Sequence, residues 1–312
     1  MQVAARMAPE AASGRLRCAV LVACHDRRET TLAGLEALEV ASSAPGAESV
    51  DWQVVLVDDG SLDGTSEAVA PRFPGIRILR GDGRLFWNGA TRLAFETALR
   101  DSPDLFLWLN DDVRLDPDGL SRLLSTWRER HRARGAKTVV VGAVRDPGTG
   151  RVTYGGLVRP RRWDPLRLAI LPQSDESARC TTFNGNCVLI PREVAATVGT
   201  NDAAFRHGLG DFDYGLRCAA AGCDLVVAAG TVGTCPRDLP AWRDASLSLR
   251  RRWAALTSAK GLPFREWRRF ARRHGGPAWP LLFVAPYLSL ARSRPDVHSR
   301  KDRPGRLAVS GR

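Results

Sequence analysis

The chain has 312 residues, of which 44% are hydrophobic and 26% charged, as in an ordinary globular protein that buries a large core. Its formal net charge of +12 is uneven, because residues 1–236 carry a net −1 and residues 237–312 carry +13. This confinement argues against a nucleic-acid-binding protein. Two interpretations of the basic region stay open, a surface for anionic lipid or another anionic partner, and a coding bias toward arginine.

Cysteine usage and hydropathy indicate the compartment. The seven cysteines include no CxxC pair, which disfavours a disulfide framework and a zinc site and favours the reducing cytoplasm. Residues 1–16 lack the apolar core of a secretory signal, and no run reaches the roughly 18 apolar residues of a transmembrane helix. The apolar segment 278–291, with its two prolines, is either a membrane-interface segment or part of a core. We expect a cytoplasmic protein, with peripheral attachment to the inner face of the cytoplasmic membrane left open.

Strand and helix patterns alternate through the first half of the chain. Apolar runs predict strands at 18–23, 53–57, 76–79, 105–109 and 138–144. Helical spacing predicts helices at 30–38, 65–69, 90–99 and 117–130. Strands separated by such helices predict an α/β fold, a Rossmann-like and mostly parallel sheet with flanking helices.

The pattern is less regular after about residue 145. We predict a hairpin over 151–158, strands at 187–190 and 224–227, and helices at 192–198 and 211–221. From residue 236 the chain is rich in Arg and Trp, with helical spacing over 246–256 and 264–273. The predicted organisation is a disordered tail (1–16), one large domain (17–235) and a basic helical C-terminal region (236–312).

Three acidic clusters carry the strongest chemical signal. Asp58-Asp59 and Asp111-Asp112 each follow an apolar run, and Asp211 with Asp213 opens a predicted helix. Open α/β sheets bind their ligands at the carboxyl ends of the strands. Neighbouring carboxylates there repel one another unless a metal or a donor-rich ligand joins them. The clusters therefore predict a metal-assisted active site, and their hard oxygen ligands suit Mg²⁺ or Mn²⁺ better than zinc.

Over roughly residues 17–235 the chain resembles family-2 glycosyltransferases of the GT-A fold. His25-Asp26-Arg27 resembles the aromatic-Asn-Arg opening of that family, and residues 55–65 resemble its nucleotide-binding signature. Asn110-Asp111-Asp112 occupies the place of the DXD metal motif. Residues 183–190 resemble the segment before the acceptor-side helix, and residues 207–217 resemble the block that carries the catalytic base. Residues 80–90 resemble a Gly-Asp-Gly-x-x-Trp-Trp-x-Gly segment of a subset that includes rhamnosyl- and galactofuranosyltransferase-like enzymes.

The resemblance implies an inverting, metal-dependent transfer of a sugar from a nucleotide-sugar donor. The implied acceptor is a saccharide or a polyprenyl-linked saccharide of cell-surface polysaccharide or glycolipid synthesis. Asp112 is the implied ligand of Mg²⁺ or Mn²⁺. Asp211 is the implied base, with Asp213 as the alternative because Gly210 stands where the family usually has Glu. The residues expected to bind the donor are Ala23, His25, Asp59, Asp82, Trp87, Asn88 and Asp111.

Several alternatives stay open. Trp87 is equally a core residue. Asp111 or Asp112 could instead cap the following turn, a role that suits Asp111 before Asp112. Thr234 and Cys235 stand where many relatives place a metal-binding His, and His207 is the nearest other candidate for a third ligand. The absence of GxGxxG and P-loop motifs disfavours a dehydrogenase and a P-loop NTPase. A sugar-phosphate nucleotidyltransferase, which needs a Gly-rich loop after the first strand, and a non-catalytic sugar-nucleotide or carbohydrate-binding relative are the competing functions.

Overall fold

The computed structural model describes residues 15–135 and 137–292. Of the predicted tail, residues 1–14 lie outside the described residues, and Leu16 already begins the first strand. The end of the basic region, residues 293–312, also lies outside them.

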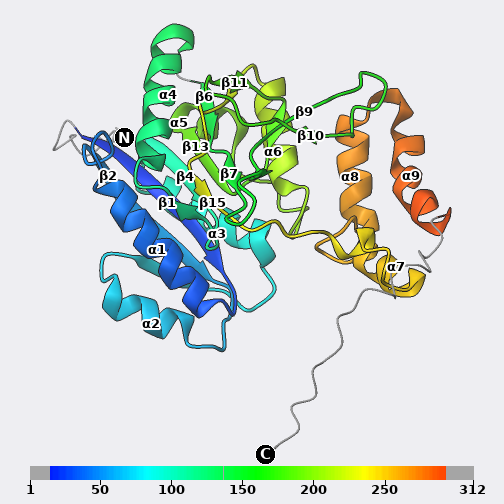
Figure 1. The fold of residues 1–312 in the computed structure, drawn as a ribbon, viewed down its shortest axis with the longest axis horizontal. Coiled ribbons are helices and arrows are strands. Elements are labelled where there is room, and N and C mark those ends of the chain that lie inside the picture. Colours follow the sequence, from blue (N-terminus) through cyan, green and yellow to red (C-terminus); the bar gives the residue numbers. More distant parts are fainter. Residues whose placement is uncertain (1–14, 136, 293–312) are drawn as a thin grey trace, which may run out of the picture.

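One large mixed sheet forms the centre of the molecule, with the strand order β11-β14-β6-β13-β4-β1-β2-β3 (Figure 1). Its strands are β1 (Leu16–Cys24), β2 (Val50–Asp58), β3 (Arg77–Arg80), β4 (Leu105–Leu109), β6 (Thr138–Val141), β11 (Ala178–Arg179), β13 (Cys187–Pro191) and β14 (Asp224–Val227). β4, β1, β2 and β3 run parallel to one another, and β14 runs parallel to β6. The predicted α/β fold with its GT-A-like sheet is confirmed.

The antiparallel strand β13 lies between β4 and β6 and joins the two halves of the sheet. Its first residue, Cys187, lies opposite Leu109, the last residue of β4. The Asn110 N–H beyond β4 donates to the Asn186 carbonyl at 2.9 Å. An antiparallel strand thus brings the segment before β13 to the edge where the parallel strands end.

Two small sheets flank the central one. The first has the order β10-β9-β12, with β9 (Gly156–Val158), β10 (Ala169–Ile170) and β12 (Thr182–Phe183). The second has the order β5-β15-β7-β8, with β5 (Arg114–Leu115), β7 (Val144–Arg145), β8 (Val152–Tyr154) and β15 (Gly233–Thr234). The predicted hairpin over 151–158 is therefore wrong. β8 pairs with β7 whereas β9 pairs with β10 and β12, so the chain changes sheet at Gly155.

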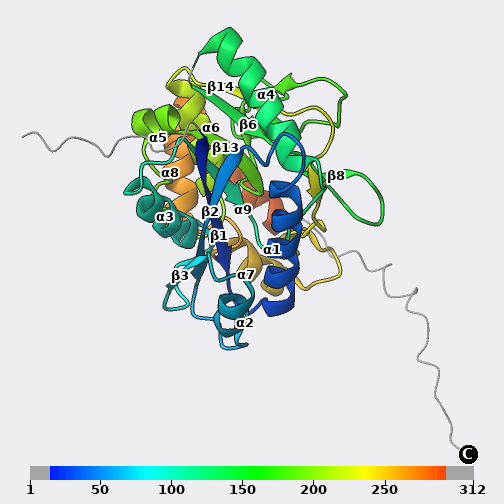
Figure 2. The same ribbon diagram turned by 90° about the vertical axis from the view of Figure 1, so that its left-hand side faces the viewer.

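Helices cover both faces of the central sheet (Figure 2). They are α1 (Arg28–Ser42), α2 (Thr65–Arg72), α3 (Phe86–Leu99), α4 (Gly119–Arg134), α5 (Arg192–Val198) and α6 (Gly210–Ala220). Alternate residues of β1 point to opposite faces, as the pleat of a strand requires. Val20 joins the core under α1 and α4, and Leu21 joins the core under α3, α5 and α6. Two apolar layers thus fix the sheet from both sides.

The C-terminal region packs beside α6, on the far side of the molecule from α1 and α2 (Figure 1). It contains the short helices η1 (Ala241–Arg243) and η2 (Gly276–Ala278) and the helices α7 (Leu249–Thr257), α8 (Phe264–His274) and α9 (Trp279–Arg292). Its core is shared with the sheet domain, because Leu209 and Leu216 pack in one cluster with Trp267 and Phe270. No helix within the described ranges is long and apolar enough to span a membrane.

Segment 278–291 corresponds closely to α9, which has two different faces. Tyr287 and Leu290 are buried in the shared core. Leu281, Val284 and Leu288 are exposed on the opposite face, with Leu281 72% accessible. The core-packing interpretation therefore accounts for one face of the segment only.

Candidate active site

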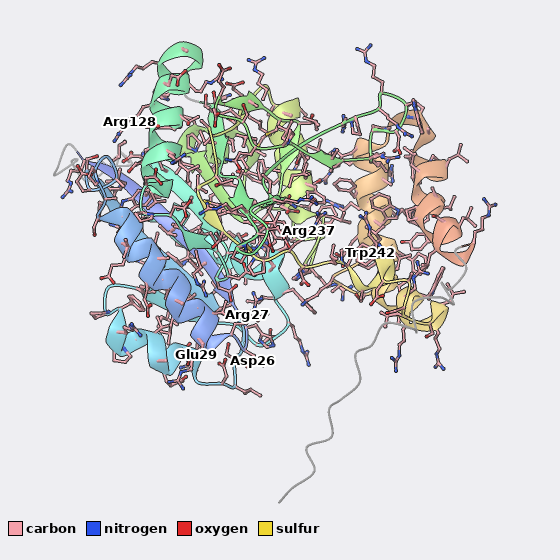
Figure 3. The ribbon with its side chains drawn as sticks, viewed as in Figure 1. Asp26, Arg27, Glu29, Arg128, Arg237 and Trp242 are labelled. Carbon is pink, nitrogen blue, oxygen red and sulfur yellow. The ribbon has the colours of Figure 1, made fainter. Side chains whose placement is uncertain are left out.

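Predicted site residues gather at the edge of the sheet where β1, β2 and β4 end and β13 begins. Ala23, the half-buried penultimate residue of β1, lies opposite Val57 of β2. His25 and Arg27 follow β1, and Figure 3 shows Arg27 beside the N-terminal end of α1. Asn110, after β4, is bonded to the segment that carries Gly185 and Asn186. The parallel strands thus deliver their polar ends to one place, as their topology requires.

The two acids at the end of β2, Asp58 and Asp59, have different roles. Asp58 is buried and accepts hydrogen bonds from the Ser61 N–H (2.9 Å) and the Ser66 hydroxyl. Burial acts to raise the pKa of Asp58, but these hydrogen bonds outweigh it and lower the pKa. Asp58 therefore organises the turn after β2, which is the structural role that capping acids play.

Asp59 holds the glycine-rich loop. Its two carboxylate oxygens accept the N–H groups of Gly83 and Phe86, each at 2.9 Å. The His25 Nδ1–H donates to the Asp59 carbonyl at 2.6 Å, so the turn after β1 is tied to the same residue. Each carboxylate oxygen keeps a second lone pair for a ligand donor.

The loop bound by Asp59 contains a strained residue and an exposed acid. Phe86 has a φ of 53°, a left-handed conformation that is costly for an aromatic residue. Its ring lies edge-on to His207 at 6.4 Å between centroids. Asp82 is exposed and accepts the Arg84 N–H at 3.0 Å. Backbone strain of this kind gathers at functional sites, where the surrounding contacts maintain it.

The second acid pair shares one cation. The Arg27 Nη1 lies 2.9 Å from Oδ1 of Asp111 and 3.1 Å from Oδ2 of Asp112. Asp111 is 6% exposed, and burial raises its pKa to about 6 although Arg27 acts to lower it. Thr31 donates to the other Asp111 oxygen at 3.4 Å. The predicted turn-capping role of Asp111 is thus replaced by an ion pair across the site.

This acid pair fits a divalent metal. Oxygens from two adjacent carboxylates converge on one cationic atom, as they would on a metal, and carboxylates are the ligands that Mg²⁺ and Mn²⁺ prefer. No cluster of three or more His, Cys, Asp or Glu side chains suited to a metal occurs in residues 15–135 and 137–292. The protein thus offers two carboxylates, and Mg²⁺ sites on nucleotide enzymes are commonly completed by phosphate and water.

Cys235 contacts the exposed side of the acid pair. Its buried thiol donates to Oδ1 of Asp112 at 3.5 Å and accepts from the Asn186 side chain at 3.8 Å. Burial, with Asp112 nearby, raises the pKa of this thiol well above its ordinary value. The sulfur is therefore a protonated donor to Asp112. His207, the other candidate third ligand, is placed against Phe86, and burial lowers its pKa to about 4.

Trp87 lies in the first turn of α3, with its ring over Gly185. Its indole N–H donates to Oδ1 of Asn110 at 2.7 Å, and its ring packs edge-on against Trp108 at 5.7 Å. A Cβ atom on Gly185 would lie 2.5 Å from the Trp87 ring, so only glycine fits beneath it. The predicted core role and the predicted site role of Trp87 are thus both consistent with its position.

Asp211 has the environment of a general base. Its carboxylate accepts the Gly185 N–H at 3.0 Å and the Phe212 N–H at 2.8 Å, and it forms no ion pair within the described residues. Burial raises its pKa to about 6. A carboxylate with a pKa close to neutrality is a better proton acceptor than an ordinary aspartate.

Asp213, two residues further, is enclosed by two arginines and a histidine. It is fully buried and bonded to Arg217 (2.8 Å), Arg273 (2.6 Å) and His274 (2.9 Å). Burial acts to raise the pKa of Asp213, but these bonds outweigh it and lower the pKa. Two of these partners belong to α8, so Asp213 fastens α6 to the C-terminal region.

Asn88 is a buried support. Its amide donates to the carbonyls of Asp202 (3.0 Å) and Phe205 (2.7 Å), and its Oδ1 accepts from Asn201 at 2.9 Å. Its side chain is wholly buried, so it stabilises the segment before α6 from within. The proposed donor site therefore does not include a direct contact from Asn88.

Sequence reasoning did not include Arg27, Asn110 and Gly185 among the site residues. Arg27 and Asn110 stood inside the motifs that carried the resemblance, so the motif positions could have found them. Gly185 acts through its backbone N–H and its lack of a side chain, and only the fold reveals that role.

The amino-acid sequence of the chain matches the profile of one protein family. Residues 19–196 match the profile of Glycosyl transferase family 2. The chain belongs to this family. The protein is therefore a glycosyltransferase that uses a nucleotide-sugar donor. A comparison with curated protein sequences found no match.

Two solved structures share the fold of this family-2 glycosyltransferase. The mannosyltransferase PcManGT from Pyrobaculum calidifontis, in complex with GDP-Man and Mn²⁺, aligns with a TM-score of 0.51 and 19% identity over 89% of this chain and 71% of that chain. S. aureus TarS, residues 1–349, aligns with a TM-score of 0.53 and 13% identity over 92% of this chain and 76% of that chain. At these identities the likeness concerns the fold.

Proposed function

We propose that this family-2 enzyme is an inverting, divalent-metal-dependent transferase of a hexosyl or deoxyhexosyl group. One observation carries the proposal. Asp211, which has no ion-pair partner among the described residues and a pKa raised to about 6, is connected through Gly185 to the segment that adjoins the Asp111-Asp112 pair. A proton acceptor and a cation-binding acid pair in one site are the parts that displacement of a diphosphate requires.

The donor is proposed to lie across the ends of β1 and β2. Ala23, His25 and Asp59 would contact the nucleoside, and the loop with Asp82 and Trp87 would contact the diphosphate and sugar. The hydrogen bonds that Asp59 accepts from this loop support the assignment, because they hold the elements proposed to bind the nucleoside and the sugar in one arrangement. The Gly81-Asp82-Gly83 sequence and Trp87 are our reason for placing the enzyme near the rhamnosyl- and galactofuranosyltransferase-like subset.

Asp112, with Asp111, would hold Mg²⁺ or Mn²⁺. A divalent cation there would offset the negative charge that develops on the departing diphosphate. The mannosyltransferase with a similar fold was solved in complex with GDP-Man and Mn²⁺, which supports this assignment by analogy.

Asp211 is proposed to take the proton from the acceptor hydroxyl as that oxygen attacks the anomeric carbon. Attack from the side opposite the diphosphate inverts the configuration at that carbon. Asp213 is not favoured as the base, because Arg217, Arg273 and His274 surround it and the two arginines stabilise its ionised form. Gly185 would position Asp211 through its N–H.

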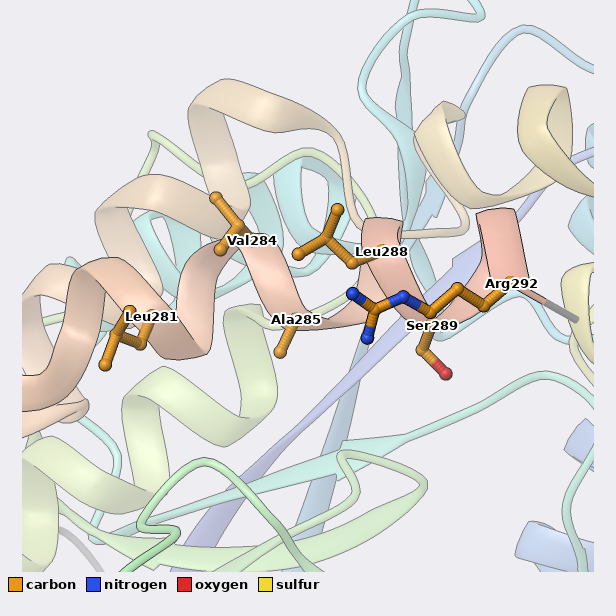
Figure 4. Close-up of a pocket in the computed structure, with 6 residues that line it drawn as sticks. All are labelled: Leu281, Val284, Ala285, Leu288, Ser289 and Arg292. Carbon is orange, nitrogen blue, oxygen red and sulfur yellow. The ribbon is translucent and has the colours of Figure 1, made fainter.

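The acceptor is proposed to be a saccharide, free or polyprenyl-linked, in cell-surface polysaccharide or glycolipid synthesis at the inner face of the cytoplasmic membrane. Of eleven exposed large hydrophobic side chains among the described residues, six lie on α7, α8 and α9. They are Leu249, Trp253, Phe264, Leu281, Val284 and Leu288. Figure 4 shows Leu281, Val284 and Leu288 along α9, in a row that ends at Arg292.

The positive charges that border this apolar face indicate what it binds. Arg250 borders the patch beside Leu249 and Trp253, and Arg292 borders it on α9. Within the described residues these two arginines form no ion pair, and residues 237–312 carry a net +13. An apolar face edged by arginines fits an anionic lipid surface.

The function is tested by donor binding and turnover. UDP-, GDP- and dTDP-sugars are screened with Mn²⁺ by thermal shift, because a ligand that binds the native state raises its melting temperature. The donor so found is then assayed for slow hydrolysis and for transfer. We expect metal-dependent turnover that Asp112→Ala abolishes. Donor binding without any turnover, with every acceptor class offered, would instead identify a non-catalytic binding protein.

A further inference from the structure

Arg27 occupies the position at which the acid pair would bind a metal. One nitrogen, Nη1, contacts Oδ1 of Asp111 and Oδ2 of Asp112 at once. In residues 15–135 and 137–292 no other cationic side chain forms an ion pair with either carboxylate. The guanidinium is therefore the counter-ion of this pair in the unliganded enzyme.

A metal and the guanidinium cannot both hold this position. A divalent cation and a guanidinium about 4 Å apart repel by about 8 kcal/mol at the effective dielectric constant of a protein surface, twice the value for two unit charges. Arg27 is free to move, because 48% of its side chain is exposed. Its backbone is fixed, since its carbonyl accepts the Thr31 N–H at 2.7 Å in the first turn of α1. The side chain can thus leave the acids while its Cα stays at the site.

We propose that Arg27 is an exchangeable counter-ion: the divalent metal displaces it from Asp111 and Asp112, and the released guanidinium binds the donor diphosphate. The inference rests on the proposed function and adds a regulation of the same site. Arginine is suited to the second role, because its planar fork of N–H donors matches phosphate oxygens.

Charge balance gives the exchange its consequence. The two carboxylates and Arg27 together carry one negative charge. A metal alone would make the site positive, and a diphosphate alone would make it strongly negative. Metal and diphosphate together restore the original single negative charge, so each ligand favours the binding of the other. Reciprocal coupling of this kind is typically about 5- to 150-fold in affinity.

The experiment measures Mn²⁺ affinity, which needs no transfer activity. Free Mn²⁺ is titrated by electron paramagnetic resonance against the full-length enzyme, alone and with UDP, GDP or dTDP. The variants are Arg27→Gln and Arg27→Lys. Arg28→Gln is the matched control, because Arg28 is an exposed neighbour whose one ion pair in the described part of the chain is with Glu29. Melting temperatures report whether each variant is folded.

We expect Arg27→Gln to bind Mn²⁺ without nucleotide about tenfold more tightly than the wild type, because the competing cation is gone. The coupling between Mn²⁺ and nucleotide should shrink in the same variant. Arg27→Lys keeps the charge and should resemble the wild type without nucleotide, as should Arg28→Gln.

If Arg27→Gln binds Mn²⁺ without nucleotide no more tightly than the wild type, the proposed exchange is wrong. Arg27 is then a permanent structural partner of the two acids. In that case intact Mn²⁺ binding by the wild type would leave the proposed function standing. If neither the wild type nor any variant binds Mn²⁺, with or without nucleotide, the acid pair is not a metal site. Both the exchange and the metal-dependent mechanism are then wrong.

Discussion

A Cβ atom on residue 210 would overlap Oδ1 of Asn88, so Gly210 and Asn88 fit together only because residue 210 has no side chain. Asn88 cannot retreat, since the carbonyls of Asp202 and Phe205 hold its amide and Asn201 donates to its oxygen. This contact explains why the residue before Asp211 is glycine, where the resemblance led us to expect glutamate. A side chain from α3 fills the space that a residue-210 side chain would need.

Replacing Gly210 should therefore disturb the start of α6. We expect Gly210→Ala to lower the free energy of unfolding by about 1–3 kcal/mol, the usual cost of overpacking, and to reduce transfer because Asp211 is the next residue. Gly208→Ala is the matched control, because a Cβ there would meet only the Gly261 carbonyl oxygen at 3.8 Å. Urea unfolding and transfer assays of both variants check this. Equal stability of the two would show that α6 absorbs the extra atom without cost.

The raised pKa of Asp211 predicts a pH profile. The base must be ionised to accept a proton, so kcat/KM should fall about tenfold per pH unit below the pKa of about 6 and level off above it. Asp211→Asn should lower the plateau by about 10²- to 10⁴-fold and remove this acidic limb. Steady-state kinetics across the acidic range, with melting temperatures to confirm folding, make the measurement. A variant that retained near-wild-type turnover would exclude Asp211 as the base.

The arginine partners of Asp213 predict a stability effect. Arg273 bonds both Asp213 and Asp202, whereas its neighbour Arg272 is exposed and forms no ion pair within the described chain. Arg273→Gln should lower the free energy of unfolding by about 1.5–3 kcal/mol, because it removes charge-assisted hydrogen bonds from a buried acid. Arg272→Gln should change it by less than about 0.5 kcal/mol. If denaturant titrations give the two variants the same stability, α8 does not clamp α6 through Asp213.

The proposed lipid-facing surface predicts vesicle binding. The triple variant Leu281→Ser, Val284→Ser, Leu288→Ser should lower binding to phosphatidylglycerol vesicles by at least about tenfold, because each buried side chain contributes roughly 1.5–3 kcal/mol. Leu62→Ser is the control, since Leu62 is 94% exposed and lies in the turn before α2. Flotation with anionic and with neutral vesicles measures the effect. Unchanged flotation would exclude this face, and a changed oligomeric state instead would identify a contact between two copies of the chain.

Elements bounded by strong local signals were predictable from the sequence. β4, α5 and β14 have the predicted bounds, because β4 and β14 are short apolar runs and α5 is a helical run between Pro191 and Gly199. α3 was predicted from residue 90 and begins at Phe86. Its first turn contains the end of the glycine-rich loop, and the hydrogen bond that the Phe86 N–H donates to Asp59, the residue after β2, holds that turn in place. Such a tertiary bond is invisible to periodicity.

The candidate site was also predictable only in part. The alternation of strands and helices predicted a parallel sheet. Asp59 and Asp111 were therefore expected to meet at the edge where its strands end. The partners of Asp213 did not follow, because Arg273 and His274 lie about sixty residues later in a region with no regular link to α6. The fit of Asn88 to Gly210 depends on a contact between two helices more than a hundred residues apart, so composition and spacing carry no trace of it.

The core shared by α6 and the C-terminal helices has a consequence for how such enzymes can diverge. Leu209 and Leu216 pack with Trp267 and Phe270, and Asp213 is paired with α8. A recombination event that exchanged only the region after residue 236 would leave these partners mismatched. The helix that carries Asp211 and the C-terminal region must therefore change together, because a substitution on one side of this core leaves its packing partner on the other side unmatched.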